Sequence, residues 1–82
     1  MNNVIVINSD DYGVMGVAQN YKTAIDCLLD WTGHELCYYD NNLHDFVYLT
    51  NEEDFKEIYN LSIDEFNEIF DGEYFLDIEP LW

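Results

Sequence analysis

The amino-acid sequence predicts an α+β fold of two layers, in which an antiparallel sheet carries three helices on one face. Strand-like apolar runs lie near both ends of the chain, and two acidic amphipathic stretches lie together in its second half. A further helical stretch follows the first strands. The predicted order is β-β-α-(ββ)-α-α-β, and the sheet combines an N-terminal β-hairpin with a C-terminal strand.

Length and composition predict a single compact domain over residues 1–82. With 82 residues, the chain is near the size at which one hydrophobic core is only just sufficient. Hydrophobic residues make up 49% and aromatic residues 17%, so the chain is too apolar to be disordered. Tyr and Phe bury a large area per side chain, which compensates for the small size.

The N-terminal segment has the pattern of a hairpin. Residues 4–7 form a β-branched run, typical of a strand that is buried on both faces or nearly so. Residues 8–13 are dense in turn formers, and residues 14–18 form the return strand. Gly16 within this second strand indicates a bulge or the close approach of another backbone.

A helix is expected next, from Tyr21 to about Trp31. Asn20 is a candidate N-cap, and Gly33 is expected to end the helix. Its apolar residues recur at helical spacing: Tyr21, Ala24, Ile25, Leu28 and Trp31. We expect this face to lie across the hairpin.

Residues 34–50 are the hardest to interpret. Residues 36–39 and 46–49 are rich in aromatic and β-branched side chains, as strands are, and residues 40–42 between them are turn-like. This segment is either a second hairpin or an irregular aromatic loop.

Residues 51–71 read NEEDFKEIYNLSIDEFNEIFD and predict two short helices joined at residues 60–61. Each helix begins with a capping-box pattern, Thr50-x-x-Glu53 in the first and Ser62-x-x-Glu65 in the second. Each also has an apolar stripe at helical spacing: Phe55, Ile58 and Tyr59, then Ile63, Phe66 and Phe70.

The C-terminal segment predicts a last strand. Gly72 is a natural C-cap for the preceding helix. Residues 74–79 then alternate as a half-buried strand does, and Pro80 ends it. Leu81 and Trp82 form an apolar tail.

The charge of the chain is strongly one-sided. Eighteen acidic residues stand against Lys22 and Lys56, which gives a net charge of −16. Direct binding to nucleic acid or to an anionic membrane is excluded as the main activity, because no cationic surface exists. The charge favours a basic partner, a metal ion or simple solubility. The sequence has no signal-peptide pattern or spanning segment, so we expect a cytoplasmic location with reduced thiols.

Metal and catalytic sites find little support. The spacing of Cys27, His34, Cys37 and His44 fits no structural zinc pattern. Cys27 also falls between apolar positions of its helix, where a small buried residue fits. The acidic turns at residues 9–13 and 40–42 lack the alternating ligands of a calcium loop. No phosphate loop, nucleophile elbow or Cys–His signature occurs, and the carboxylates are expected on solvent faces. We therefore expect no cofactor, no metal and no enzymatic activity.

The predicted partner-binding residues are carboxylates away from the apolar stripes of the two acidic helices: Glu52, Glu53, Asp54, Glu57, Asp64, Glu65, Glu68 and Asp71. Like charges three or four residues apart oppose a helix by about 0.2–0.5 kcal/mol per pair. One interpretation is a solvated face that serves solubility. The other is mimicry of nucleic acid, since carboxylates on adjacent helical turns lie about 6 Å apart along the axis, close to two steps of the roughly 3.4 Å rise of one DNA strand.

In size and in these acidic helices, at residues 52–57 and 64–71, the chain resembles small acidic proteins of phages and mobile elements, such as anti-CRISPR and anti-restriction inhibitors. The resemblance rests on no specific motif. It implies a basic nucleic-acid-binding protein of the host as the target, no catalysis, and a place in the host cytoplasm.

Two alternatives remain open. The chain would be a small interaction module if an aromatic surface around Tyr38, Tyr39, Tyr48 and Trp82 bound another protein or itself. An immunity protein against a basic toxin nuclease would share the electrostatics and differ only in its partner.

Overall fold

The computed structural model of the protein describes residues 3–80, so Leu81 and Trp82 of the predicted tail lie outside the described residues. Within residues 3–80, three helices and five strands follow one another in the predicted order. Their bounds are β1 (Asn3–Ser9), β2 (Gly13–Ala18), α1 (Tyr21–Thr32), β3 (Leu36–Asp40), β4 (Asp45–Leu49), α2 (Glu52–Tyr59), α3 (Ile63–Ile69) and β5 (Tyr74–Pro80).

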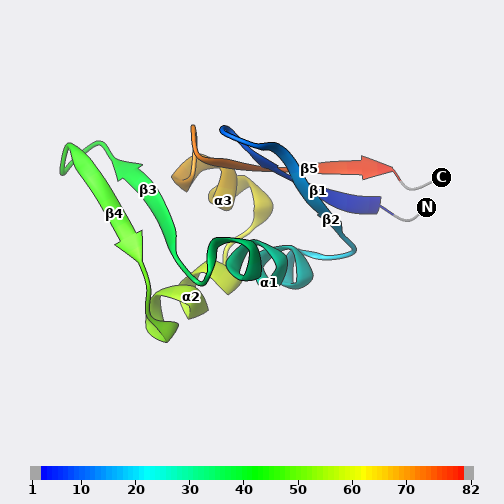
Figure 1. Cartoon of the computed structure of the whole chain (residues 1–82), viewed down its shortest axis with the longest axis horizontal. Coiled ribbons are helices and arrows are strands. Elements are labelled where there is room, and N and C mark those ends of the chain that lie inside the picture. The colour runs from blue at the N-terminus through cyan, green and yellow to red at the C-terminus, as the bar shows by residue number, and fades with distance from the viewer. Residues whose placement is uncertain (1–2, 81–82) are drawn as a thin grey trace.

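The α+β class is confirmed, with two antiparallel sheets of strand order β2-β1-β5 and β3-β4. Figure 1 shows these sheets at opposite ends of the molecule's long axis, with α3 between them and α1 and α2 below. No helix within residues 3–80 is both long and apolar enough to cross a membrane.

The three-stranded sheet has β1 at its centre. Ile5 and Ile7 of β1 are buried, whereas Val4 and Val6 on the opposite face are half-buried. The buried face contacts α1 and, through β5, α3. The strand is thus covered fully on one side only, because the helices form a single layer.

A β-bulge interrupts the pairing of β1 and β2. Ile7 pairs with Gly16 and Asn8 pairs with Val14, which leaves Met15 as the extra residue. This confirms the bulge indicated by the glycine. A Cβ atom at Gly16 would lie 3.7 Å from Cys27 Sγ, so α1 passes close to β2 at this point.

The ends of α1 match the prediction. Asn20 Oδ1 accepts a hydrogen bond from the Thr23 backbone N–H at 2.8 Å, and Gly33 has the left-handed φ of 70°. The apolar face was predicted correctly except at Trp31, whose side chain is 59% exposed. Leu29, on the other border of the stripe, is buried instead, because α2 packs against that side of α1.

The caps of the acidic helices agree with the prediction in part. The capping box of Ser62 and Glu65 is present at the start of α3, with both hydrogen bonds at 3.1 Å. The predicted capping role of Thr50 is wrong. Asn51 caps α2 instead, since its side chain accepts from the Asp54 backbone N–H at 3.0 Å and the helix begins one residue later.

The end of α3 also differs from the prediction. Phe70 is its C-cap, and Gly72 lies two residues further on, in the turn that leads into β5. Its φ of 86° shows why a glycine is present there. In β5, Leu76 is buried and Ile78 is 51% exposed, so only the first half of the strand is half-buried as predicted.

The segment of uncertain structure is a second hairpin, formed by β3 and β4. The carboxylate of Asp40 accepts hydrogen bonds from the backbone N–H groups of Asn42 and Leu43, which fixes the turn. Leu36 and Leu49 pair across the strands and are buried. The hairpin therefore attaches to the core through its base.

An aromatic cluster joins the two ends of the molecule. The rings of Phe66 and Phe70, both fully buried on or next to α3, are stacked with centroids 4.5 Å apart. Tyr21 of α1 contacts Phe66 edge-on at 6.4 Å, and Tyr38 of β3 contacts Phe70 at 5.8 Å. Tyr74 of β5 lies 6.1 Å from Phe70. The cluster thus connects α1, α3 and both sheets.

The free edge of β5 is covered by a side chain. The amide of Asn67, on α3, donates to the Leu76 backbone oxygen at 2.9 Å and accepts from its N–H at 2.7 Å. These are the two hydrogen bonds that a neighbouring strand would make at Leu76. Asn67 therefore closes this edge of the sheet at its midpoint.

We expect Phe66→Ala to lower the free energy of unfolding by about 3–5 kcal/mol, because it leaves a cavity in the aromatic cluster. That loss is a large part of the roughly 5–15 kcal/mol that stabilises an ordinary domain. Urea unfolding followed by circular dichroism measures it. Phe46→Ala is the matched control: that ring is 44% exposed, and an equal loss there would contradict the central role of the cluster.

The surroundings of Tyr21 lead us to expect that the free energy of unfolding falls at alkaline pH. Its hydroxyl donates to the Ile58 carbonyl oxygen at 2.6 Å. Burial, with a smaller contribution from the charge of Glu65, raises the pKa of Tyr21 from 10.0 to about 12. The folded state then retains the proton that the unfolded chain loses, so its contribution is complete below pH 10 and disappears as the pH approaches 12.

The variant Tyr21→Phe should be less stable at pH 8 by about 0.5–1.5 kcal/mol, the value of one hydrogen bond. The gap to the unmodified protein should narrow at pH 11, measured by urea unfolding at both pH values. A gap that stays constant or widens with pH would refute this assignment. Tyr48→Phe, at an exposed ring, controls for the loss of a hydroxyl.

Candidate functional site

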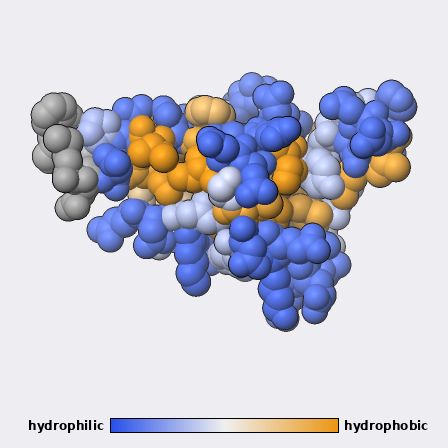
Figure 2. Space-filling view, turned by 180° about the vertical axis from the view of Figure 1, so that it is seen from behind, coloured by the Kyte–Doolittle hydropathy of each residue, from blue (hydrophilic) through white to orange (hydrophobic). Residues whose placement is uncertain are grey.

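All 18 side-chain carboxylates of the chain fall within the described residues, and none of them is buried. Of the eight predicted partner-binding residues, Asp54 is half-buried and the other seven are exposed: Glu52, Glu53, Glu57, Asp64, Glu65, Glu68 and Asp71. Figure 2 shows hydrophilic residues spread over every part of the rear face, with hydrophobic residues exposed between them.

The first turn of α2 carries three of the eight predicted residues: Glu52, Glu53 and Asp54. Acidic groups at a helix N-terminus are stabilised by the helix dipole. Lys56 Nζ lies 3.9 Å from Glu53 Oε1, an exposed ion pair that contributes little to stability. Helix structure therefore accounts for part of the charge on α2.

Other predicted residues have different surroundings. Asp54 and Glu57 of α2 line a small hollow of about 110 Å³ with Tyr38 and with Ile69 of α3. Glu65 is engaged in the capping box of α3. Figure 1 shows α3 between the two sheets and α2 on the lower side, so the two acidic helices do not lie side by side along their length.

Asp71 lies with acids that the prediction did not include. It lines a hollow of about 200 Å³ together with Asp10, from the β1–β2 turn, and Glu73, from the α3–β5 loop. The Asp10 backbone N–H donates to the Glu73 carbonyl oxygen at 3.1 Å, which holds the two loops together. Loops distant in the sequence thus gather carboxylates at one end of the sheet.

A second hollow lies beside the first, and Ser9, Glu73 and Tyr74 line both. Its volume is about 420 Å³, within the range of small-ligand sites. We call it the aromatic hollow, and its lining residues are Ser9, Asp11, Tyr12, Met15, Trp31, Thr32, Glu73 and Tyr74. Sequence reasoning missed it, since only the adjacency of Asp11 and Tyr12 in a turn hinted at such a site.

Two groups in this region are affected by the negative charge. Burial raises the pKa of the Tyr74 hydroxyl, and the charges of Cys37, Glu73, Asp11 and Glu35 raise it further. Burial likewise raises the pKa of the Cys37 thiol, with added effects of Glu73 and Glu35. Burial is the larger cause of both shifts, and nearby negative charge is the smaller one. Asp11 and Glu73 line the aromatic hollow, so their charge disfavours anions there and favours cations.

Each lysine of the chain already has an acidic partner. Lys22 Nζ lies 3.1 Å from Asp26 Oδ2 and 5.6 Å from the centroid of the Tyr59 ring. The Tyr59 hydroxyl donates a hydrogen bond to Asp26. This bond raises the pKa of Tyr59 to about 12 and, together with Lys22, lowers the pKa of Asp26. With Lys56 paired to Glu53, neither lysine is a free cation.

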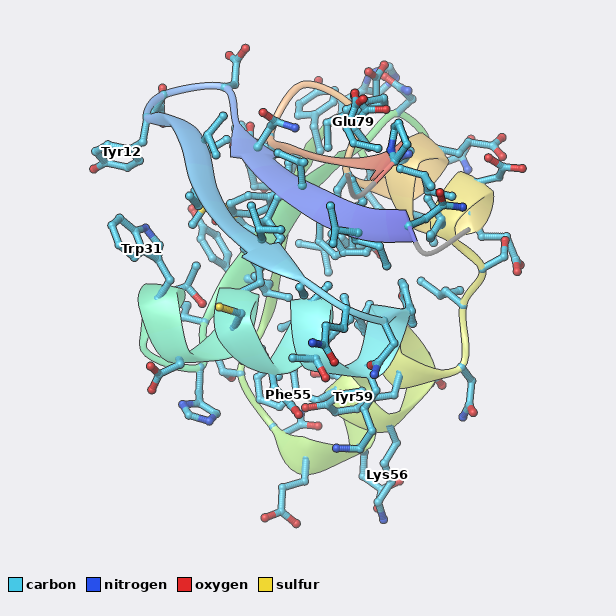
Figure 3. The ribbon with its side chains drawn as sticks, turned by 90° about the vertical axis from the view of Figure 1, so that its right-hand side faces the viewer. Tyr12, Trp31, Phe55, Lys56, Tyr59 and Glu79 are labelled. Atoms are coloured by element: carbon cyan, nitrogen blue, oxygen red, sulfur yellow. The ribbon has the colours of Figure 1, made fainter. Side chains whose placement is uncertain are left out.

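The outer face of β5 carries a close pair of carboxylates. Asp77 and Glu79 are two residues apart and so project from the same face of the strand. A hydrogen bond from the protonated Glu79 carboxyl to Asp77, and then the negative charge of Asp77, raise the pKa of Glu79. Figure 3 shows Glu79 at the top of the molecule, far from α2 at the bottom. Negative charge is therefore dense on the sheet as well as on the helices.

The Cys and His residues do not form a ligand set within the described chain. No group of three or more His, Cys, Asp or Glu side chains in residues 3–80 is arranged to hold a metal ion. Cys27 and Cys37 are free thiols, and Cys27 is exposed although its position between apolar residues suggested burial. His34 packs edge-on against Phe55, with ring centroids 6.3 Å apart.

Aromatic residues also cover the outer face of the β3–β4 hairpin. Tyr39 pairs with Phe46 across the strands, and their rings meet edge to face at 5.4 Å. Tyr48 is 60% exposed on the same face. Of the predicted aromatic surface, Tyr38 instead points inward to the core cluster, and Trp82 lies outside the described residues.

Comparison with known proteins gave no relative: no family model, no curated protein and no solved structure matches the chain.

The thiols should differ in reactivity. We expect Cys27 to be alkylated by iodoacetamide well before Cys37, because Cys27 is exposed whereas burial and nearby acids raise the pKa of Cys37. Peptide mass spectrometry after timed reaction at pH 7.5 measures both rates. Glu73→Gln should speed the reaction of Cys37 and leave that of Cys27 unchanged. Equal rates in the unmodified protein would contradict the assigned surroundings.

Proposed function

We propose that this protein is a non-catalytic inhibitor that occupies the basic groove of a nucleic-acid-binding protein, such as a CRISPR effector or a restriction enzyme. The observation that supports the proposal is the sign of the surface charge, which is almost entirely negative. All 18 side-chain carboxylates are unburied, and both lysines are paired with acids. A groove lined with Lys and Arg would meet 18 carboxylates and two lysines, and each lysine already lies beside an acid.

Long-range attraction is the physical basis of such inhibition. Complementary charge raises the association rate, and the effect falls as salt screens the field over about 8–10 Å. Carboxylates on successive turns of α2 and α3 supply acceptors at about twice the axial rise between phosphates of one DNA strand. Like charges that repel one another in the free protein are neutralised in the groove, so this relief adds to affinity. A target of this kind places the protein in the host cytoplasm.

The exposed aromatic residues of the β3–β4 hairpin support a second candidate function. Tyr39, Phe46 and Tyr48 expose aromatic area on one face, and aromatic residues commonly anchor protein interfaces. In that case the protein is an interaction module, its acidic surface serves solubility, and its affinity for a partner depends on the hairpin more than on charge.

Neutralisation of the acidic helices tests the proposal. We expect Glu57→Gln, Asp64→Asn and Glu68→Gln, combined, to weaken inhibition by about 1.5–3 kcal/mol for each carboxylate that meets a lysine or arginine. Competition with a fluorescent DNA duplex for a panel of CRISPR effectors and restriction enzymes measures the change. Stability should not fall, because repulsive pairs are removed. Glu65 is left unchanged because it caps α3.

The control variant makes the same change of charge elsewhere: Asp30→Asn, Asp77→Asn and Glu79→Gln. Asp10 and Asp11 are unsuitable for this purpose, because they line the hollows that also contain Glu73. Inhibition should persist in the control and should weaken as salt rises. The mimic proposal is wrong if the acidic-helix variant inhibits as well as the control variant. If a third variant, Tyr48→Ala, is the only one that abolishes binding, the aromatic module is favoured.

A further inference from the structure

We propose that the aromatic hollow binds an arginine side chain of the partner protein. This inference rests on the proposed function in assuming a basic protein partner, and it adds a contact that is separate from the acidic helices. It assigns a role to Trp31, whose exposure on α1 is otherwise unexplained by packing.

Two aromatic rings from different elements border the hollow. Tyr12 belongs to the β1–β2 turn and is 74% exposed, and Trp31 lies in the last turn of α1 and is 59% exposed. Figure 3 shows both side chains projecting on the same side of the molecule, one above the other. Met15, the extra residue of the bulge, and Tyr74 complete the apolar lining. The rings therefore offer accessible flat surfaces around one space.

Carboxylates from two separate loops lie at the same hollow. Asp11 comes from the β1–β2 turn and Glu73 from the loop before β5. Both residues line the hollow together with Tyr74, so their negative charge lies at the lining itself. Aromatic faces beside carboxylates are the surroundings in which proteins bind organic cations.

The chain supplies no cation for this hollow from its side chains. It contains no arginine, and its two lysines are held elsewhere. Lys22 pairs with Asp26, and Lys56 pairs with Glu53 at the bottom of the molecule in Figure 3, away from Tyr12. An arginine that fills the hollow must come from another molecule.

Lys22 shows how this protein already binds one of its own cations with an aromatic ring and a carboxylate. Lys22 Nζ lies over the Tyr59 ring and against the Asp26 carboxylate. One ammonium thus lies between an aromatic face and an acid on the surface of this protein. The aromatic hollow has the same components, with two exposed rings and two acids.

Geometry favours arginine over lysine. The guanidinium group is planar, stacks on aromatic faces, and presents a fork of donors that reaches two carboxylates at once. Lysine offers a compact, strongly hydrated charge that cannot stack. A hollow lined by flat rings and by acids from two loops therefore suits arginine better than lysine.

Synthetic peptides test the site on the full chain. Three capped peptides share a neutral Gly/Ser sequence and differ at one central residue, which is arginine, lysine or the neutral isostere citrulline. Nuclear magnetic resonance follows the indole N–H of Trp31 during titration. We expect the arginine peptide to bind most tightly and to shift that signal. Equal affinity for citrulline or for lysine overturns the proposal.

Substitutions in the hollow test whether its aromatic rings and acids bind the arginine peptide. Trp31→Leu keeps apolar bulk and should weaken binding of the arginine peptide about 3- to 10-fold, as the loss of one cation–π contact does. Glu73→Gln should also weaken it. Tyr48→Leu, at a ring of nearly the same exposure (60%), is the control and should have no effect. Trp31→Leu with unchanged affinity overturns the assignment, provided that circular dichroism confirms a folded variant.

The two proposals fail in different ways. If the acidic-helix variant still inhibits the target, nucleic-acid mimicry is refuted. Peptide binding that is selective for arginine and depends on Trp31 would still support the arginine site in the hollow. Peptide binding that ignores the central charge refutes the hollow, and the inhibition assay with the acidic-helix variant is unaffected by that result.

Discussion

The stacked pair of Phe66 and Phe70 is the contact on which the rest of the structure depends. A chain of this size with a net charge of −16 repels itself in every compact form, so apolar contacts must outweigh that repulsion. The pair receives Tyr21 from α1, Tyr38 from the hairpin and Tyr74 from β5. Two small sheets that do not pair with each other are thereby held as one body.

Structure explains some of the acidic residues and leaves others without a structural role. Glu65 caps a helix, Asp40 fixes a turn, and Asp26 bonds both a tyrosine and a lysine. Glu57 and Glu68, in contrast, lie on exposed helix surface in the company of other acids. Like-charge pairs at such positions oppose a helix, so we expect carboxylates of the second kind to destabilise the free protein, and they are the ones on which the proposed partner would act.

The order of elements, the N-terminal hairpin and most caps were predictable, because capping, turn formation and helical periodicity depend on neighbours in the sequence. The β3–β4 hairpin was only one of two open alternatives, because its aromatic residues fit a strand and a loop alike. The exposure of Trp31 was not, since periodicity gives the direction of a side chain and not whether another element covers it. The eight predicted acids were correctly placed at or near the surface. The proximity of Asp71 to Asp10 was beyond prediction, because it depends on two loops that meet only in the folded chain.

The amide of Asn67 limits how copies of this chain can associate. Fibrous growth by strand addition requires an open edge on each side of a sheet, so that every added copy presents a new one. Because Asn67 occupies the β5 edge at Leu76, an added strand could pair along the whole β2 edge but along only part of the β5 edge. Growth by strand addition on both sides of this sheet is therefore hindered, which helps to keep an aromatic-rich protein from polymerising by that route.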